Sequence, residues 1–255
     1  TILNPDGSTD IPVIVYFDNR LDIRALRRQV RTSLQGKNLT RKELRRLQRQ
    51  TTRRTMLKQL KANLEQPRAI LAKFLADHGI QRNINELWSV NALALSLPTE
   101  LAGLLLGLDG VLKVSIDYTF TLSETTTEVT SGVPLWNLED INATSLWEND
   151  LTGEGVVVGI MDSGVDVNHP DLSDKWRGGN NSWYDPFGTY ATPVDTVGHG
   201  TQVTGLVLGG DNSGYQVGVA PRAQWIAAKI FDDTGLSNIS HISASFQCFL
   251  HLVER

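Results

Sequence analysis

The chain has 255 residues, a formal net charge of −4, 40% hydrophobic residues and 20% charged residues. This composition excludes collagen-like and wholly disordered chains, and the length is enough for one large domain or two smaller ones. The single cysteine, Cys248, excludes an internal disulfide framework. No apolar run approaches the roughly 18 residues that a membrane helix needs, so we expect no membrane span.

The modest net charge conceals a polarised chain. Residues 20–73 carry 17 Lys and Arg against 3 Asp and Glu, a net charge of +14, whereas the remainder carries 7 against 25, a net charge of −18. Segments this different indicate two domains. Nucleic-acid binding by the basic segment is disfavoured because no aromatic residues are interleaved, and a solvated helix face is the commoner explanation. Electrostatic docking of the basic segment on the acidic part fits better.

The first half of the chain alternates between strand-like and helical patterns. Ile11–Phe17 is rich in β-branched and aromatic residues, which is typical of a strand. Leucines at helical spacing predict a long basic helix from Thr40 to about Leu64, with Thr40 and Glu43 as a capping pair. The remaining predicted elements are a helix at 67–77, a strand at 86–97, a short helix at 98–108 and a strand at 111–122. We therefore expect a small α+β domain over residues 10–122.

The second half has a different character. Residues 123–134 are polar and rich in Thr, which predicts an exposed linker. The short apolar run VVVGIM that follows is typical of a strand covered on both faces of a parallel sheet. The predicted elements alternate as a strand at 156–161, a helix at 201–208, a strand at 224–231 and a helix at 238–253. This alternation indicates an α/β domain over residues 135–255.

Two residues of this second domain are candidates for chemistry. Asp162 follows the VVVGIM strand directly, and catalytic groups of open α/β sheets gather at the carboxyl ends of the strands. His199 lies between two glycines at a predicted helix start. Taken singly, each has a plain alternative, a turn or capping Asp and an ordinary His. Together they have the types and the chain order of an Asp and a His in a nucleophilic triad.

The strings around these residues, VVVGIMDSGVDVNHPDL and GHGTQVTG, resemble the Asp and His signatures of the subtilisin-like serine peptidases, family S8. From Trp136 through Phe231 the chain is most similar to the bacillopeptidase F branch. The end of the first domain, ALALSLPTELAGLLLGLDGVLKVSIDYTF, is similar to inhibitor I9-type propeptides. The resemblance implies an α+β propeptide domain followed by the N-terminal part of an α/β subtilisin-like parallel-sheet domain.

The resemblance implies a secreted serine endopeptidase that cleaves polypeptides, in which Asp162 orients His199 and no cofactor is required for catalysis. Gln202 replaces a second His that is not catalytic in the family. Within the 255 residues we find neither a Gly-Thr-Ser-x-Ala motif nor an oxyanion-hole Asn, and no signal peptide. We therefore interpret the chain as truncated before the catalytic Ser and expect it to be inactive alone.

The resemblance also implies roles outside the triad. The propeptide would dock on the catalytic domain until it is cut within residues 123–134. The alternative is a non-catalytic product whose first domain binds and inhibits a related peptidase in trans. Asp171 and Asn212 match positions that hold structural Ca²⁺ in some relatives, and carboxylate and amide oxygens suit that ion. A helix-capping Asp and a solvated loop are the alternative there.

Overall fold

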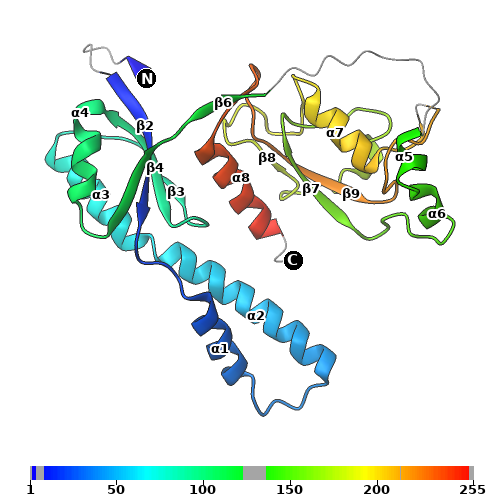
Figure 1. The fold of residues 1–255 in the computed structure, drawn as a ribbon, viewed down its shortest axis with the longest axis horizontal. Coiled ribbons are helices and arrows are strands. Elements are labelled where there is room, and N and C mark those ends of the chain that lie inside the picture. Colours follow the sequence, from blue (N-terminus) through cyan, green and yellow to red (C-terminus); the bar gives the residue numbers. More distant parts are fainter. Residues whose placement is uncertain (1, 4–8, 123–135, 213, 253–255) are drawn as a thin grey trace. The chain divides into compact units, whose positions relative to one another are not determined.

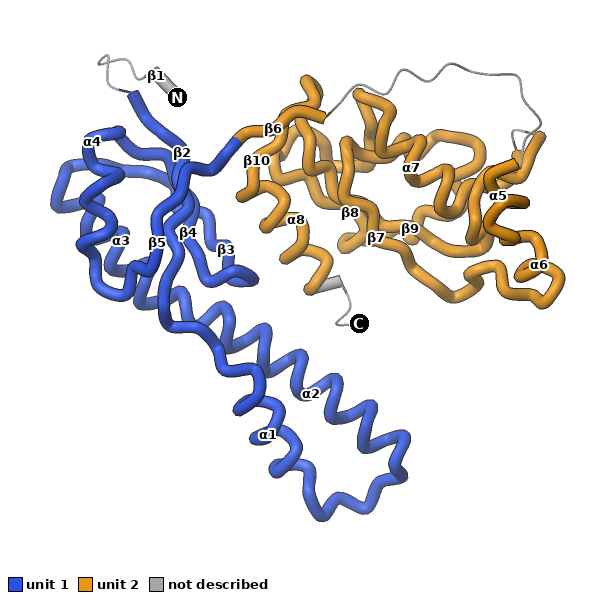
Figure 2. The backbone as a smooth tube through the Cα atoms, viewed as in Figure 1, with its two compact units in different colours: residues 1–118, 254 blue, residues 119–253, 255 orange. Residues whose placement is uncertain are grey.

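The structure of the chain is a computed structural model that describes residues 2–3, 9–122, 136–212 and 214–252 (Figure 1). The predicted linker, residues 123–134, lies outside the described residues. The chain divides into two compact units, residues 1–118 and residues 119–253 (Figure 2). The division falls inside the predicted first domain, so that residues 119–122 belong to the second unit.

Unit 1 is built on an antiparallel sheet. Its strands are β1 (Ile2–Leu3), β2 (Thr9–Phe17), β3 (Asn85–Leu87), β4 (Ala92–Pro98) and β5 (Val111–Ile116). Strand β2 is central, because Val15 lies opposite both Leu93 of β4 and Val114 of β5. Val13, Ile14 and Val15 are all buried, which explains the unbroken apolar run. The predicted strand at 11–17 is therefore confirmed.

Two predicted strands of unit 1 are wrong in extent. The run at 86–97 is a hairpin of β3 and β4 rather than one strand, because Asn91 turns the chain at a φ of 55° and its amide donates to Phe17 O at 2.9 Å. Asparagine tolerates this left-handed conformation better than most residues. The run at 111–122 is also broken, because β5 ends at Ile116 and a separate strand, β6 (Thr119–Thr121), follows.

The helices of unit 1 include a basic hairpin (Figure 1). They are α1 (Ile23–Ser33), α2 (Arg41–Ala62), α3 (Glu65–Asp77), α4 (Thr99–Ala102) and the 3₁₀ helix η1 (Gly103–Gly107). The capping box of α2 is confirmed, since Glu43 N donates to Thr40 Oγ1 and Thr40 N donates to Glu43 Oε2. Helix α1 was not predicted; its Leu26 and Val30 pack against Leu44 of α2.

Unit 2 contains a parallel sheet in the order β7-β9-β8, together with a small antiparallel pair. Its strands are β6, β7 (Val157–Asp162), β8 (Trp183–Tyr184), β9 (Gln224–Lys229) and β10 (Leu236–Asn238). Its helices are α5 (Trp136–Asp140), α6 (Ala143–Trp147), η2 (Ser173–Lys175), α7 (His199–Leu208) and α8 (Ile239–Leu252). The predicted order of strand, helix, strand and helix is confirmed in β7, α7, β9 and α8.

The core of unit 2 lies against the parallel sheet. Leu172, Leu208 and Trp225 are fully buried there, and the Trp225 indole donates to Leu172 O at 2.8 Å. Helices α7 and α8 both pack on β7. At Gly159 of β7, a Cβ atom would come within 3.0 Å of the Phe249 ring of α8. This packing holds β7 and α7 in a fixed relation, and the candidate site lies where they meet.

Candidate active site

The structure brings Asp162 and His199 into direct contact. Asp162 is the last residue of β7 and lies at the carboxyl end of the parallel sheet, whereas His199 is the first residue of α7. The imidazole Nδ1 and the carboxylate Oδ1 are 2.7 Å apart, although 37 positions separate the residues in sequence. The carboxylate is 12% exposed and the imidazole 26%, so the pair is sheltered but reachable.

The contact orients the imidazole. Oδ1 of Asp162 also accepts a hydrogen bond from Ser163 N at 2.7 Å, which holds the carboxylate in place. When the neutral His199 ring donates from Nδ1 to this carboxylate, Nε2 retains its lone pair. A ring held in this tautomer has the arrangement that a general base needs, with the carboxylate placed to stabilise the imidazolium that forms when Nε2 takes a proton.

Two glycines allow the two loops to approach this closely. A Cβ atom on Gly200 would lie 2.1 Å from Gly164 O and 3.0 Å from Asp162 Cβ. A Cβ atom on Gly164, whose φ is 123°, would lie 1.9 Å from Val194 O. Only glycine fits at either position, so the Asp-Ser-Gly and Gly-His-Gly strings have a steric explanation as well as a chemical one.

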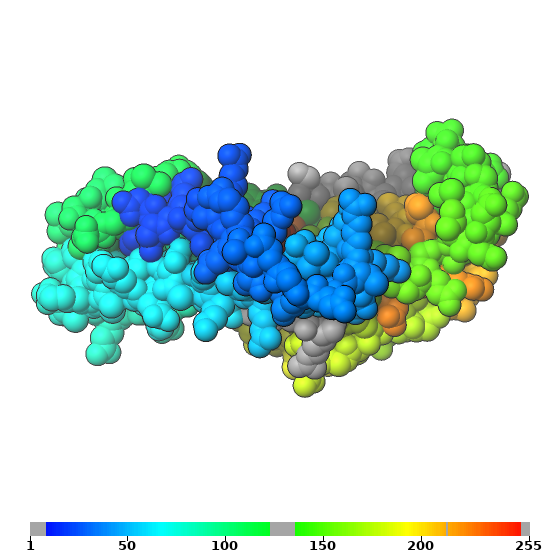
Figure 3. All heavy atoms as spheres, turned by 90° about the horizontal axis from the view of Figure 1, so that it is seen from below, coloured from blue at the N-terminus to red at the C-terminus, as the bar shows by residue number. Residues whose placement is uncertain are grey.

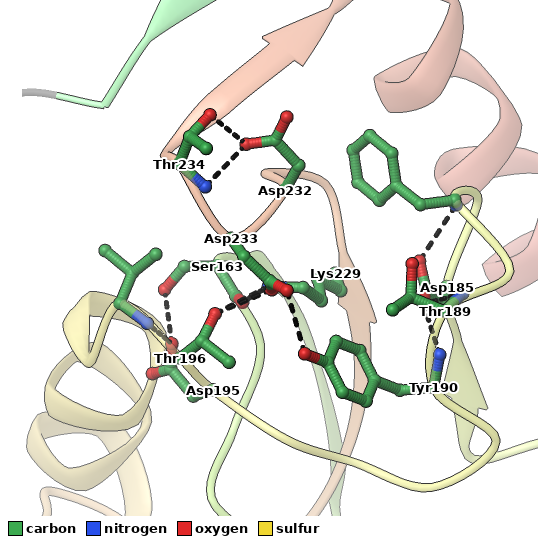
Figure 4. A network of polar contacts seen from close by, with 12 residues as sticks. Ser163, Asp185, Thr189, Tyr190, Asp195, Thr196, Lys229, Asp232, Asp233 and Thr234 are labelled. Atoms are coloured by element: carbon green, nitrogen blue, oxygen red, sulfur yellow. Dashed lines mark hydrogen bonds and ion pairs between the residues drawn. The ribbon is translucent and has the colours of Figure 1, made fainter.

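Asp195 links the two loops, and Figure 4 shows its contact with Ser163. Its Oδ1 accepts from Ser163 Oγ at 2.9 Å and from Gly198 N at 2.8 Å, and its Oδ2 accepts from Thr201 N and Oγ1 at 2.8 and 2.7 Å. Ser163 Oγ in turn accepts from Gly200 N at 2.9 Å. We call these contacts the Asp195 clasp. It joins the residue after Asp162 to both residues that flank His199.

The hydrogen bonds of the clasp change the acidity of Asp195. Burial would raise the pKa of this carboxyl, but hydrogen bonds from Thr201, Gly198 and Ser163 outweigh burial and hold the pKa below its usual value. Sequence reasoning missed Asp195. The available signal was an acidic residue four positions before His199, in a loop that has no other charged residue close to the helix start.

A buried lysine supports the same loop from the sheet. Lys229, the last residue of β9, is 1% exposed, and its Nζ donates to Ser163 O at 2.9 Å and lies 3.2 Å from Asp233 Oδ1. Asp233 accepts from Thr196 Oγ1 at 2.7 Å and from Tyr190 OH at 2.8 Å, and these bonds lower its pKa (Figure 4). The network ties the end of β9 to the loop before His199. Sequence reasoning missed it too, although Lys229 is the one charged residue in the apolar run QWIAAKIF.

Strand β10 lies directly after this network. Asp233 belongs to the turn that leads into β10. A hydrogen bond from Asp232 N to Leu236 O closes this turn. Strand β6 pairs antiparallel with β10, with Phe120 opposite Ser237, and Leu122 N donates to Gly235 O at 2.8 Å. Backbone groups of β10 thus bind an extended segment, in the mode known as strand addition.

The predicted calcium ligands lie in neighbouring segments without forming a metal cluster. Gly210 N donates to Asp171 O at 3.0 Å, and Asn212 Nδ2 donates to Pro170 O at 2.8 Å. In the described part of the chain, no group of three His, Cys, Asp or Glu side chains is placed to hold a metal ion. A Cβ atom on Gly210 would lie 3.0 Å from Lys175 Nζ, so an ammonium group already lies beside this loop. The residues therefore fit a cation poorly, and the calcium site stays a prediction.

The fold and the site together define a class of protein. An α/β parallel sheet that presents an Asp from a strand end and a His from the next helix start has the arrangement expected for two of the three groups of a nucleophilic triad. Residues 153–247 match the Subtilase family, peptidase S8. Over this region the chain is similar to the subtilisin-like serine peptidases.

Individual relatives agree with this assignment. The chain is 31% identical to Bacillopeptidase F of Bacillus subtilis (strain 168) over 208 residues, which cover 72% of this chain and 14% of that protein. It is 38% identical to the intracellular serine protease of Paenibacillus polymyxa over 98 residues, 38% of this chain and 30% of the relative. It is 31% identical to the minor extracellular protease Epr of Bacillus subtilis (strain 168) over 141 residues, which cover 52% of this chain and 21% of that protein. The chain thus spans less than a third of each of these relatives.

A solved structure shares the fold. The epidermin leader peptide processing serine protease (EpiP) of Staphylococcus aureus superposes with a TM-score of 0.59 at 16% identity, over 93% of this chain and 47% of that one. Within the described residues, no helix is both long and apolar enough to cross a membrane.

Proposed function

We propose that unit 2 is the N-terminal part of the catalytic domain of a subtilisin-like serine endopeptidase. The observation that carries the proposal is the 2.7 Å contact between His199 Nδ1 and Asp162 Oδ1 at the carboxyl end of a parallel strand. His199 Nε2 takes the proton of a nucleophilic Ser and returns it to the leaving amine, and Asp162 holds the ring and stabilises the imidazolium. The 255 residues contain no Gly-Thr-Ser motif for the nucleophile, so we expect this chain alone to be inactive.

Polypeptide substrates bind along β10 in this proposal. The pairing of β6 with β10 supports it, because β6 is itself an extended segment held by backbone hydrogen bonds that any sequence can make. Side chains of the bound segment alternate in direction, and the Phe120 ring meets the Phe231 ring edge to face at a centroid distance of 5.8 Å. Asp233, in the turn before β10, accepts a hydrogen bond from Thr196, which lies three residues before His199. This bond connects the substrate-binding strand to the loop that carries the general base His199.

The first domain acts as a propeptide in this proposal. Its last residues, 119–122, contain β6 and so occupy the strand-binding edge that a substrate would need. Cleavage within residues 123–134 would free that edge. Secretion is a further part of the proposal, supported by the similarity to an extracellular protease.

The test is casein hydrolysis by the gene product, including any residues beyond Arg255. His199→Ala is expected to lower kcat by about 10⁶ and Asp162→Asn by about 10⁴, the losses that follow removal of these roles in subtilisin. His78→Ala, on unit 1, is the matched control and leaves hydrolysis unchanged. Full hydrolysis by His199→Ala would contradict the proposal.

Residues 1–255 alone provide the second arm. This chain is expected neither to hydrolyse casein nor to react with a fluorophosphonate, and labelling of any Ser would show that a nucleophile exists where the family pattern does not place it. The alternative function is inhibition in trans. It predicts that the full chain inhibits subtilisin E at stoichiometric concentration, and that Phe120→Ala weakens the inhibition.

A further inference from the structure

Unit 1 contains a groove between α1 and α2 that the peptidase chemistry does not use. Its volume is about 610 Å³. Figure 3 shows the surface of these two helices, coloured from blue (α1) to cyan (the end of α2). The residues that line the groove are Ile23, Arg27, Val30, Arg31, Arg45, Gln48, Arg49, Thr52, Arg53 and Met56. Half of them are arginines, although the same two helices and their connecting loop also contain lysines.

Four of the five groove arginines have little counter-charge of their own. Arg27, Arg31, Arg45 and Arg49 are exposed, and within the described residues none of these four forms an ion pair with an acidic side chain. The acidic residues nearest in sequence are already used as helix caps. The Asp22 carboxylate accepts from Arg24 N and Ala25 N at the start of α1.

The start of α2 has the same arrangement. The Glu43 carboxylate accepts from Thr40 N at 2.8 Å and Thr40 Oγ1 at 2.6 Å, and these two bonds lower the pKa of Glu43. Both carboxylates are thus committed to backbone and hydroxyl donors at the helix starts. The charge of Arg27, Arg31, Arg45 and Arg49 must therefore be balanced from outside the hairpin.

The lining favours a ligand that only accepts hydrogen bonds. Guanidinium groups donate and cannot accept, and no carboxylate lines the groove; the amide of Gln48 and the hydroxyl of Thr52 are its only strong side-chain acceptors. A peptide would bring backbone N–H groups that find few acceptors here. Phosphate oxygens accept only, and the planar fork of arginine matches them with two parallel hydrogen bonds.

The spacing favours a chain of phosphates over a single one. Arg45, Arg49 and Arg53 follow each other at intervals of four residues on α2, so their positions repeat about every 6 Å along one helix face. Arg27 and Arg31 repeat at the same interval on α1. Two such rows face a common groove. No aromatic side chain lines it, so bases would have nothing to stack on.

We propose that the α1–α2 groove binds a linear phosphate polymer through its two rows of arginines. The probe is medium-chain inorganic polyphosphate, titrated into the full chain by calorimetry at several salt concentrations. Arg45→Gln with Arg49→Gln is expected to weaken binding at least about tenfold and to lower the slope of log K against log salt by about 1 per arginine.

The matched control changes the same helix and the same net charge. Arg46→Gln with Arg54→Gln removes two exposed arginines of α2 that do not line the groove, and it is expected to weaken binding less than about threefold. Circular dichroism of both variants checks that the helices are retained.

Three results would overturn the proposal. Equal weakening by the two double variants would mean that the charge of the hairpin acts diffusely, without a site. Equally tight binding of polyglutamate of the same charge would make the ligand a carboxylate polymer. Tighter binding of a single-stranded oligonucleotide than of polyphosphate would make it a nucleic acid. Because the readout is binding by unit 1, none of these results depends on peptidase activity.

Discussion

The α1–α2 hairpin and the Asp162–His199 site are both rich in charged residues, but they treat charge in opposite ways. The 22 residues of α2 bury only Leu57, and Arg27, Arg31, Arg45 and Arg49 of the groove are exposed. At the site, by contrast, each charged group has a defined partner: Asp162 contacts His199, Asp195 binds both loops, and Lys229 binds Ser163 O.

The difference follows from where the charges lie in sequence. Arg27, Arg31, Arg45 and Arg49 lie on helices whose backbone hydrogen bonds do not involve these side chains, so the four guanidinium groups are available to a ligand. The site charges come from segments far apart in the chain, so each bond between them also fixes the fold. We therefore expect substitutions in the hairpin to change binding with small effects on stability, and substitutions in the site to destabilise unit 2.

The largest effect is expected for Gly164→Ala. The new Cβ atom would lie 1.9 Å from Val194 O, at a φ of 123° that alanine rarely adopts. Both the clash and the backbone strain oppose folding, so unit 2 should lose about 3 kcal/mol or more. Urea unfolding followed by tryptophan fluorescence measures this loss, because Trp88 is the only one of the six tryptophans in unit 1.

Gly188→Ala separates the two causes. Gly188 also lies in unit 2 and has a positive φ of 70°, but no atom lies within 4 Å of the position of its Cβ. Gly188→Ala should lower the stability of unit 2 only through the strained left-handed backbone, by about 1 kcal/mol. If the two variants unfold at the same urea concentration, the close approach of the loops at Gly164 does not exist.

Asp195→Asn comes next. The variant replaces one acceptor oxygen by an NH₂ group that faces backbone donors such as Gly198 N or Thr201 N, so at least one bond of the clasp is lost and a donor is left unpaired. We expect a loss of about 2 kcal/mol in the same urea experiment. The control is Asp174→Asn, whose carboxylate is 65% exposed and should matter by less than about 0.5 kcal/mol. Equal stabilities for the two variants would show that the clasp contributes nothing.

Asp195 also predicts a smaller effect, on the pH dependence of stability. Its pKa in the folded protein lies below the usual value of 3.8, so the unfolded chain binds more protons in acid. Stability from this group is therefore complete above about pH 4 and decreases as the pH falls through the folded pKa. The stability difference between wild type and Asp195→Asn should shrink as the pH is lowered from 5 toward about 2. If the stability difference between wild type and Asp195→Asn grew as the pH fell, the pKa of Asp195 would be raised in the folded protein, and the prediction would be wrong.

The elements that were predicted correctly are those whose pattern is complete within one segment. The buried run of β7, the apolar strand β2 and the capping box of Thr40 and Glu43 each carry their own signal. The Asp162–His199 contact was also foreseeable, because strand ends and helix starts of an α/β sheet converge at one edge.

The missed features depend on contacts with distant residues. Helix α1 shows only a thin apolar stripe among arginines, and it gains its partner only when α2 lies beside it. The turn between β3 and β4 was not predicted because turns are expected to be exposed and polar. Trp88 and Asn91 of this turn are instead buried, as residues of a continuous strand would be. Asp195 belongs to a loop without periodicity, and its partners come from two other segments.

The smallest effect tests the hairpin side of the comparison. Thr40→Ala removes the side-chain acceptor of Glu43 N and frees the Glu43 carboxylate from Thr40 Oγ1, so the first turn of α2 should lose about 1 kcal/mol. Hydrogen exchange of the first-turn amides of α2 measures this local loss, while urea unfolding of unit 2 should not change. Thr51→Ala, inside α2, is the control and should slow exchange slightly, since alanine favours the helix. If Thr40→Ala lowered the stability of unit 2 as much as Asp195→Asn does, the charges of the hairpin would be as deeply coupled to the fold as those of the site, and the contrast between the two regions would be wrong.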